Sequence, residues 1–119
     1  MKAALASFLI EYPSTKAILI GTRRTDPYSL HLKPFQVTDE SWPQVMRIHP
    51  ILDWKYSDVW TEILDDHIPY CVLYDRGYTS LGDQNNTLPN PQLCSKEREF
   101  GYDEAWKLTN ELGERDGRI

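Results

Sequence analysis

The first residues of the chain are mostly apolar, and the spacing of the larger ones is that of a helix. Leu5, Phe8 and Leu9 follow the i, i+3, i+4 spacing of one helix face, and alanines occupy most positions between them. This pattern predicts a helix over residues 2–11. The run 17–20 (Ala-Ile-Leu-Ile) is continuously apolar and lies between turn-forming residues, which predicts a short strand buried on both faces.

Prolines interrupt the next stretch, residues 22–43, so a long loop is expected there. Such a loop within a compact domain is uncommon and is usually functional. Residues 46–52 form a second candidate strand. Because Pro50 lacks the backbone N–H that a sheet requires, we expect this strand at an edge or at a bulge.

The second half of the chain predicts two further helices. Ser57 is a suitable N-cap for a helix over residues 58–66, whose apolar stripe contains Trp60 and Leu64. Residues 71–74 are expected to be extended, and Gly77 is expected to adopt positive φ in a turn. Asp103 is expected to cap a last helix over residues 104–112, with Gly113 beyond its end.

A helix, a tight turn and an apolar strand make half of a right-handed crossover unit, which predicts an α/β fold. The chain has 119 residues, 40% of them hydrophobic, which suits one domain with a modest core. Its net charge of −5 argues against a nucleic-acid surface, so contact with a phosphate must come from local arginines. No apolar run is long enough to span a bilayer, and residues 1–10 lack a signal-peptide cleavage site.

The loop after the first predicted strand, residues 21–27 (Gly-Thr-Arg-Arg-Thr-Asp-Pro), carries the first candidate chemistry. In open α/β sheets, ligands bind at this edge. Arg23 offers a fork of donors that matches phosphate oxygens, and Asp26 offers an acceptor for a ring N–H or a ribose hydroxyl. The alternative is that Asp26 closes a turn before Pro27 and that the arginines are solvated.

Two other groups carry similar alternatives. Trp42, followed by Pro43, either packs on the core or stacks on a flat ligand. Arg115 and Arg118, placed after the last predicted helix, either form a solvated basic tail or clamp a phosphoryl group. Cys71 and Cys94 match no metal motif and are expected to be reduced thiols of a cytoplasmic protein. The spacing of the histidines predicts no metal site either.

Several of these segments occur together, in an order and at intervals that resemble a known family. They are Gly21–Pro27, Asp39-x-x-Trp42-Pro43-x-x-Met46-Arg47, residues 50–54, residues 73–82, Asn90-Pro91 and Arg115-Asp116-Gly117-Arg118. This set closely resembles eukaryotic FAD synthase (FMN adenylyltransferase), in the PAPS reductase-like branch of the adenine nucleotide α-hydrolase superfamily. The resemblance covers nearly the whole chain beyond the first predicted helix.

The resemblance implies a Rossmann-like, doubly wound sheet and transfer of AMP from MgATP to FMN, which gives FAD and pyrophosphate. It implies small-molecule partners only, FMN and ATP, with Mg²⁺ accompanying ATP, no nucleic acid, no membrane and a monomeric complete protein. It also implies roles for individual residues. The flavin is assigned to Asp26, Trp42, Pro43, Met46 and Arg47; the nucleotide to Gly21, Arg23, Arg115 and Arg118; and the catalytic set to Asp26, Arg115 and Arg118.

The sequence departs from that family at one point. Family members open with a strand and a glycine-rich loop that holds the ATP phosphates at a helix N-terminus, and residues 1–119 contain no such loop. We therefore expect the chain to be the C-terminal portion of a single domain of this kind. Three alternatives remain open, namely an inactive flavin- or nucleotide-binding remnant, a sulfonucleotide-binding protein related to PAPS reductase, and an interaction domain without a ligand.

Overall fold

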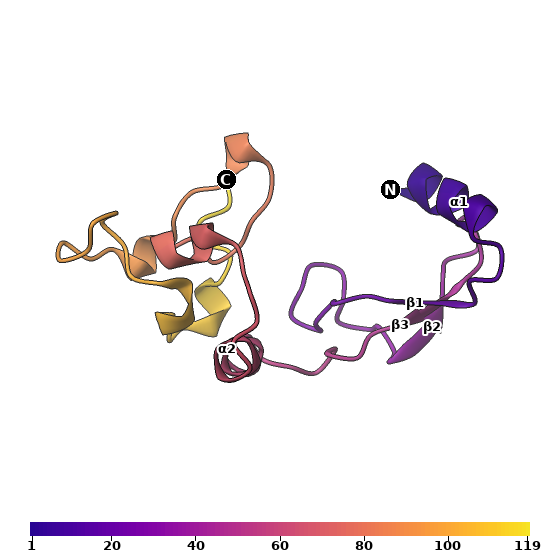
Figure 1. Cartoon of the computed structure of the whole chain (residues 1–119), viewed down its shortest axis with the longest axis horizontal. Helices are drawn as coiled ribbons and strands as arrows, with labels where there is room; N and C mark the ends of the chain where they lie inside the picture. The colour runs from indigo at the N-terminus through magenta and orange to yellow at the C-terminus, as the bar shows by residue number, and fades with distance from the viewer. The chain divides into compact units, whose positions relative to one another are not determined.

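The computed structural model describes all 119 residues and divides into two compact units, Met1–Trp54 and Lys55–Ile119. Each unit is described by itself. The first contains helix α1 (Lys2–Glu11) and strands β1 (Ala17–Leu19), β2 (Phe35–Val37) and β3 (Met46–Ile48), and the second contains helix α2 (Tyr56–Asp65) and a series of 3₁₀ turns (Figure 1). None of the helices combines the length and apolar character that a membrane span requires.

The three strands of the first unit form one mixed sheet in the order β1-β3-β2. β1 runs parallel to β3, with Ile18 opposite Arg47, and β2 runs antiparallel to β3, with Phe35 opposite Ile48. The carboxyl ends of β1 and β3 therefore lie at the same edge of the sheet. The predicted α/β class is confirmed, and the central position of β3 places Arg47 in the middle of the sheet.

The structure corrects four predictions for this unit. Residues 22–43, expected to be a loop, include β2, in which Phe35 and Val37 suit a strand and which pairs antiparallel with β3. The second candidate strand ends at Ile48 and is central, and Pro50 lies in the turn that follows. The strand after the first helix is not buried on both faces, since Leu19 is 72% exposed.

The second unit has a hydrophobic core around α2. Its buried members are Tyr56, Trp60, Leu93, Ala105 and Leu108. Trp60 makes edge-on contacts with Tyr70 and Tyr74, with ring centroids 5.2 and 5.3 Å apart. The Tyr56 hydroxyl donates to the Ala105 carbonyl over 2.7 Å, which ties the helix to a 3₁₀ turn.

Helix α2 begins earlier than expected because Ser57 is not its N-cap. The helix starts at Tyr56, and the Asp58 carboxylate accepts from the Lys55 backbone N–H over 2.8 Å. Ser57 contacts Glu111 instead, donating from both its hydroxyl and its backbone N–H. The apolar stripe through Trp60 and Leu64 packs on the core, as predicted.

Two further predictions for the second unit are wrong. Residues 72–76 form a 3₁₀ helix instead of an extended segment, although Gly77 ends it at φ 85°, as expected. Instead of a helix over residues 104–112, the structure has 3₁₀ turns at Ala105–Lys107 and Glu111–Gly113. A helix of this length is marginal without tertiary support, and Asp103, its expected cap, pairs with Arg98 and Lys107 instead.

Candidate functional site

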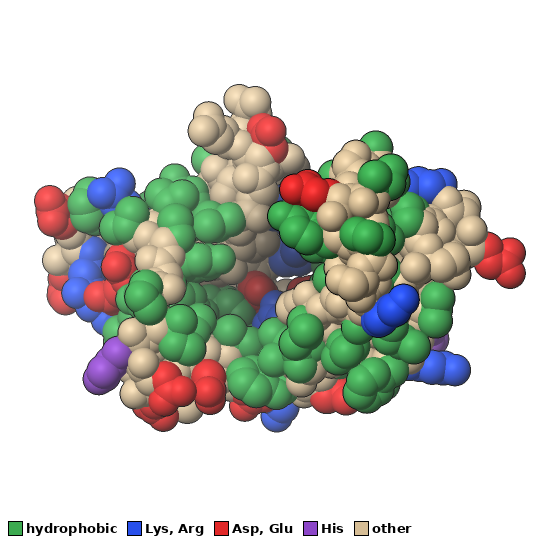
Figure 2. Space-filling view, turned by 45° about the vertical axis from the view of Figure 1, so that its right-hand side comes forward, with side chains coloured by type: hydrophobic (Ala, Val, Ile, Leu, Met, Phe, Trp, Pro, Cys, Tyr) green, Lys and Arg blue, Asp and Glu red, His purple; other side chains and the backbone are tan.

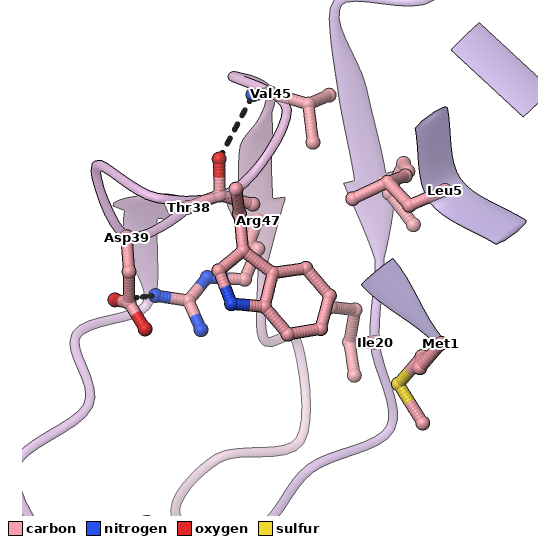
Figure 3. A pocket seen from close by; sticks show the side chains of 9 residues that line it. Met1, Leu5, Ile20, Thr38, Asp39, Val45 and Arg47 are labelled. Carbon is pink, nitrogen blue, oxygen red and sulfur yellow. Dashed lines mark hydrogen bonds and ion pairs between the residues drawn. The ribbon is translucent and has the colours of Figure 1, made fainter. Parts of the chain in front are cut away.

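A pocket of about 300 Å³ opens beside β1 in the first unit (Figure 3). Ile18 lies on β1 and Ile20 directly after it, Leu5 lies on α1, and Met1 immediately precedes α1. Val45 closes the apolar wall. These side chains offer a flat or aliphatic group a surface with almost no competing polar atoms.

The opposite side of the pocket carries its polar groups and is built by the loop between β2 and β3 together with Arg47 of β3. Thr38, Asp39, Trp42 and Arg47 line it. The Thr38 hydroxyl donates to the Pro43 carbonyl over 2.7 Å and accepts from the Val45 N–H over 3.2 Å. These bonds hold the loop that carries Trp42 against the end of β3.

Arg47 is the charged residue with the most restricted surroundings in this pocket. Its Nη2 donates to the Val37 carbonyl over 3.2 Å. The same nitrogen lies 3.5 Å from Asp39 Oδ1 (Figure 3). Its Nε is buried and has no hydrogen-bond partner. Since an unpaired buried donor costs free energy, the Nε of Arg47 marks a place where a ligand acceptor would be stabilising.

The structure brings Trp42 and Arg47 together, as the flavin assignment requires, but not the other three residues of that set. Pro43 contributes its carbonyl to the loop, and Met46 is absent from the lining. Asp26 is also absent from it. The sequence reasoning missed Thr38 and Asp39 as lining residues, although Asp39 stands at a fixed interval before Trp42 in the motif.

Asp26 lies in the loop after β1 and pairs with Arg23. The Arg23 backbone N–H donates to Asp26 Oδ2 over 2.8 Å, and the Arg23 guanidinium lies 3.3 Å from Oδ1. Asp26 donates its own N–H to the Arg23 carbonyl, so it closes a tight turn. Arg23 is buried, whereas the neighbouring Arg24 pairs with Asp53 over 2.7 Å, which lowers the pKa of Asp53 and raises that of Arg24. The roles implied for Gly21, Arg23 and Asp26 remain predictions.

Arg115 and Arg118 lie in the second unit, and their surroundings differ. The Arg115 side chain is exposed. Arg118 Nη1 donates to the Ser80 hydroxyl over 3.3 Å and to the Leu81 carbonyl over 3.0 Å. The solvated-tail alternative is therefore wrong for Arg118, whose head group the protein holds in place.

The chain offers no group of three or more metal-ligating side chains. Cys71 and Cys94 are both free and exposed. A carboxylate beside an arginine at the edge of an apolar pocket, with one arginine donor unpaired, is suited to a flat ring that has a polar edge.

The profile of the phosphoadenosine phosphosulfate reductase domain family matches residues 1–89. The chain belongs to this family. Its resemblance to the FAD synthases within the family is borne out by three comparisons, two with curated relatives and one with a solved structure.

The probable FAD synthase of Schizosaccharomyces pombe is 50% identical over 118 residues, which make up 99% of this chain and 44% of that protein. The flavin adenine dinucleotide synthase of Saccharomyces cerevisiae is 41% identical over 113 residues, 95% of this chain and 37% of that one. The chain thus spans less than half the length of these relatives.

The crystal structure of Candida glabrata FMN adenylyltransferase in complex with FAD and inorganic pyrophosphate superposes with a TM-score of 0.92 at 34% identity. The match covers all of this chain and 53% of that one. An adenosine 5'-phosphosulfate reductase of Lysinibacillus sphaericus is 31% identical, over only 63% of this chain.

Proposed function

We propose that the chain supplies the flavin pocket and an arginine contact to phosphate for an FMN adenylyltransferase. In the proposed reaction a phosphate oxygen of FMN attacks the α-phosphorus of ATP. The bond between that phosphorus and the bridging oxygen of the pyrophosphate group breaks, and FAD and pyrophosphate are the products. The names of the relatives, and the FAD and pyrophosphate named for the solved structure, support this reaction class.

The observation that carries the proposal is the pocket around Trp42 and Arg47. An isoalloxazine ring is flat and largely apolar, with a row of carbonyl oxygens and ring nitrogens along one edge. Its face would lie against Trp42, and its apolar end against Ile18 and Ile20. A carbonyl oxygen at its polar edge would accept from the buried Nε of Arg47, which has no partner in the protein.

The carboxylate that lines this pocket is that of Asp39. We therefore propose that Asp39 is the acceptor for a ring N–H of the flavin. Asp39 also holds Arg47 at 3.5 Å, so the same carboxylate would orient the arginine. Asp26, which is bonded to Arg23, would instead stabilise the loop at the end of β1.

Transfer of a nucleotidyl group depends on positioning and on stabilisation of charge on the phosphate oxygens. In this proposal Arg118 supplies part of that stabilisation, and its permanent charge suits the task. Magnesium would enter as the ion that ATP carries, bound mainly by phosphate oxygens.

Titration with FMN, followed by quenching of flavin fluorescence, tests the pocket. Trp42→Ala should weaken FMN binding by about tenfold, as expected for loss of one aromatic stacking partner. Arg47→Lys keeps the charge but removes the Nε donor, and it should also weaken binding. Trp106→Ala, at an exposed tryptophan of the other unit, is the matched control. Unchanged FMN binding in both pocket variants would show that the flavin lies elsewhere.

Chromatography of FMN and MgATP incubated with the chain tests the reaction, with FAD and pyrophosphate expected in equal amounts. Because residues 1–119 contain no glycine-rich phosphate loop, we expect FMN binding to be the stronger of the two signals. FMN binding without any FAD would favour the alternative of a flavin-binding remnant. Absence of both would refute the proposal.

A further inference from the structure

Arg118 is held by the protein at both ends of its side chain. Its backbone forms an isolated antiparallel bridge with Thr87, and the neighbouring bonds run from the Leu88 N–H to the Gly117 carbonyl and from the Ile119 N–H to the Asn86 carbonyl. Its guanidinium donates from Nη1 to Ser80 and Leu81. The head group of this arginine is therefore oriented before any ligand arrives.

The loop that receives the guanidinium is itself braced. The Thr87 hydroxyl accepts from the Gly82 N–H over 3.1 Å and donates to the Asp83 carbonyl over 2.8 Å. Ser80 is buried. The segment 80–87 thus forms a loop whose first residues accept hydrogen bonds from the guanidinium of Arg118 and whose last residue pairs with the Arg118 backbone. We call this segment the arginine seat.

The arginine seat uses one side of the guanidinium and leaves the other available. The two hydrogens of Nη1 are directed to Ser80 and Leu81, while Nε and Nη2 have no partner in the protein. The buried nitrogens that lack partners belong to Arg47 and Arg76, so the free donors of Arg118 face accessible space. An edge formed by Nε–H and Nη2–H is the arrangement that binds two oxygens of one oxyanion.

Gly82 is the residue that makes this orientation possible. A Cβ atom at position 82 would overlap the guanidinium of Arg118, with Nη2 and the central carbon as its nearest neighbours. Because the obstructed atoms are at the far end of a flexible side chain, an added methyl would displace the arginine head rather than the backbone. Arg115 has an exposed side chain and no comparable seat.

We propose that Ser80, the Leu81 carbonyl and Gly82 are positioning residues, which orient Arg118 so that its Nε–Nη2 edge binds two oxygens of a phosphate group. This inference rests on the proposed function, since it specifies how that function's phosphate contact is built. It also distinguishes the two arginines of the C-terminal pair. Arg118 defines the geometry of the phosphate contact, and Arg115 adds charge without a fixed direction.

Pyrophosphate is the probe for the experiment, which uses the whole 119-residue chain. Its affinity is measured by calorimetry, and the Nε–H signal of Arg118 is followed by ¹⁵N-edited NMR, with Arg118→Lys assigning that signal. Ser80→Ala removes one acceptor and Gly82→Ala displaces the head group. Each should lower pyrophosphate affinity about tenfold, comparable to the loss of one charge-assisted hydrogen bond, and each should shift or broaden the Arg118 signal.

Two control variants match these changes. Ser95→Ala removes a hydroxyl that makes no hydrogen bond to the protein, and Gly101→Ala adds a methyl where no atom lies within 4 Å. Both should leave pyrophosphate affinity and the Arg118 signal unchanged. Circular dichroism shows whether each variant is folded, and Ser80→Ala keeps the test valid if Gly82→Ala does not fold.

The outcomes separate this inference from the proposed function. Weaker binding in Arg118→Lys together with unchanged binding and signals in Ser80→Ala and Gly82→Ala would overturn the positioning role and leave the function standing. No pyrophosphate binding by the unmodified chain would overturn the inference as well, and FMN titration would then decide the function independently. Loss of pyrophosphate affinity in Ser80→Ala and Gly82→Ala, but not in Ser95→Ala and Gly101→Ala, would support the positioning role.

Discussion

The two units of the chain are stabilised in different ways. The first, Met1–Trp54, contains the three-stranded sheet and the loops between its strands, yet its buried apolar side chains are only Val45 and Leu52. The second, Lys55–Ile119, has a single α-helix and otherwise short 3₁₀ turns, but it contains the whole of the hydrophobic core cluster. The sheet and the buried core cluster are therefore found in different parts of this molecule.

Polar contacts explain how the second unit holds so much irregular backbone. Asn90 is completely buried, and its amide donates to Thr79 Oγ1 and to the Gly113 carbonyl, while its side-chain oxygen accepts from the Gln92 N–H. One side chain thus connects three stretches that are distant in sequence. Irregular backbone needs such partners because buried N–H and C=O groups must be paired.

The first unit differs from the second mainly in how few apolar side chains it buries. Both units expose large apolar side chains, and hydrophobic side chains cover much of the face drawn in Figure 2. In the first unit they include Phe8, Leu19, Phe35 and Val37. In this unit the strands pair through their backbones, while Val45 and Leu52 are the only buried apolar side chains. A substitution in the first unit should therefore affect strand residues with exposed side chains, and one in the second unit should affect buried contacts. Four experiments test this difference.

Asn90→Ala should have the largest effect. It removes three hydrogen bonds from a buried site and leaves the Gln92 N–H without a protein partner, whereas the Thr79 hydroxyl and the Gly113 carbonyl keep their bonds to Glu114 and Asp116. This should lower the free energy of unfolding of the second unit by about 3 kcal/mol. Urea denaturation followed by NMR signals of that unit measures the loss. Asn85→Ala is the control, because that side chain is exposed and makes no hydrogen bond. A loss below about 1 kcal/mol would mean that the network is not what stabilises the unit.

Two glycines with positive φ allow a matched comparison. Gly77 has φ 85° and Gly101 has φ 76°, but a Cβ at Gly77 would lie 2.5 Å from the Cβ of Tyr102, whereas one at Gly101 meets nothing. Gly101→Ala should cost about 1 kcal/mol for the left-handed backbone alone. Gly77→Ala should cost clearly more, since it adds a steric clash. Equal losses in thermal unfolding would show that the backbone near Tyr102 adjusts freely.

Acid should weaken the contact between Ser57 and Glu111. Hydrogen bonds from the Ser57 hydroxyl and backbone N–H lower the pKa of Glu111 below its usual range. A carboxyl with a lowered folded-state pKa contributes stability above its unfolded pKa and loses it as the pH falls through the folded value. Urea melts from about pH 6 to about pH 3 should therefore show a smaller decline in Glu111→Gln than in the unmodified chain.

Glu99→Gln is the control for that measurement, since Glu99 is exposed and forms no ion pair. Its decline in stability with acid should equal that of the unmodified chain. If stability declined with acid equally in Glu111→Gln and in the unmodified chain, the contact with Ser57 would not contribute to the stability of residues 111–113.

Leu19→Thr should have the smallest effect of the four. Leu19 lies on β1 with its side chain 72% exposed, and threonine suits a strand, so the free energy of unfolding should change by less than about 0.5 kcal/mol. Analytical ultracentrifugation should show less self-association, because an exposed apolar strand residue has been removed. A large loss of stability would mean that this face is buried after all, and the contrast between the units would fail.

Part of the fold and of the candidate site was predictable from local patterns. Helix α1, the strand that begins at Ala17 and the strand at Met46 follow from short-range periodicity, and the left-handed Gly77 follows from turn chemistry. Trp42 and Arg47 were assigned to one ligand by resemblance, and the structure places both in one pocket. Thr38 and Asp39 were missed because their importance depends on a hairpin loop that closes only when β2 pairs with β3.

The sequence by itself determined the α/β class, the family motifs and the residue types that suit a flavin and a phosphate. Tertiary structure decided which of those residues share a site. Asp26 is engaged by Arg23, the buried Nε of Arg47 is left unpaired, and Arg118 is oriented by residues more than 35 positions earlier in the chain. The physical reason is that local sequence controls backbone preference, whereas hydrogen-bond partners and burial depend on segments that meet only in the folded chain.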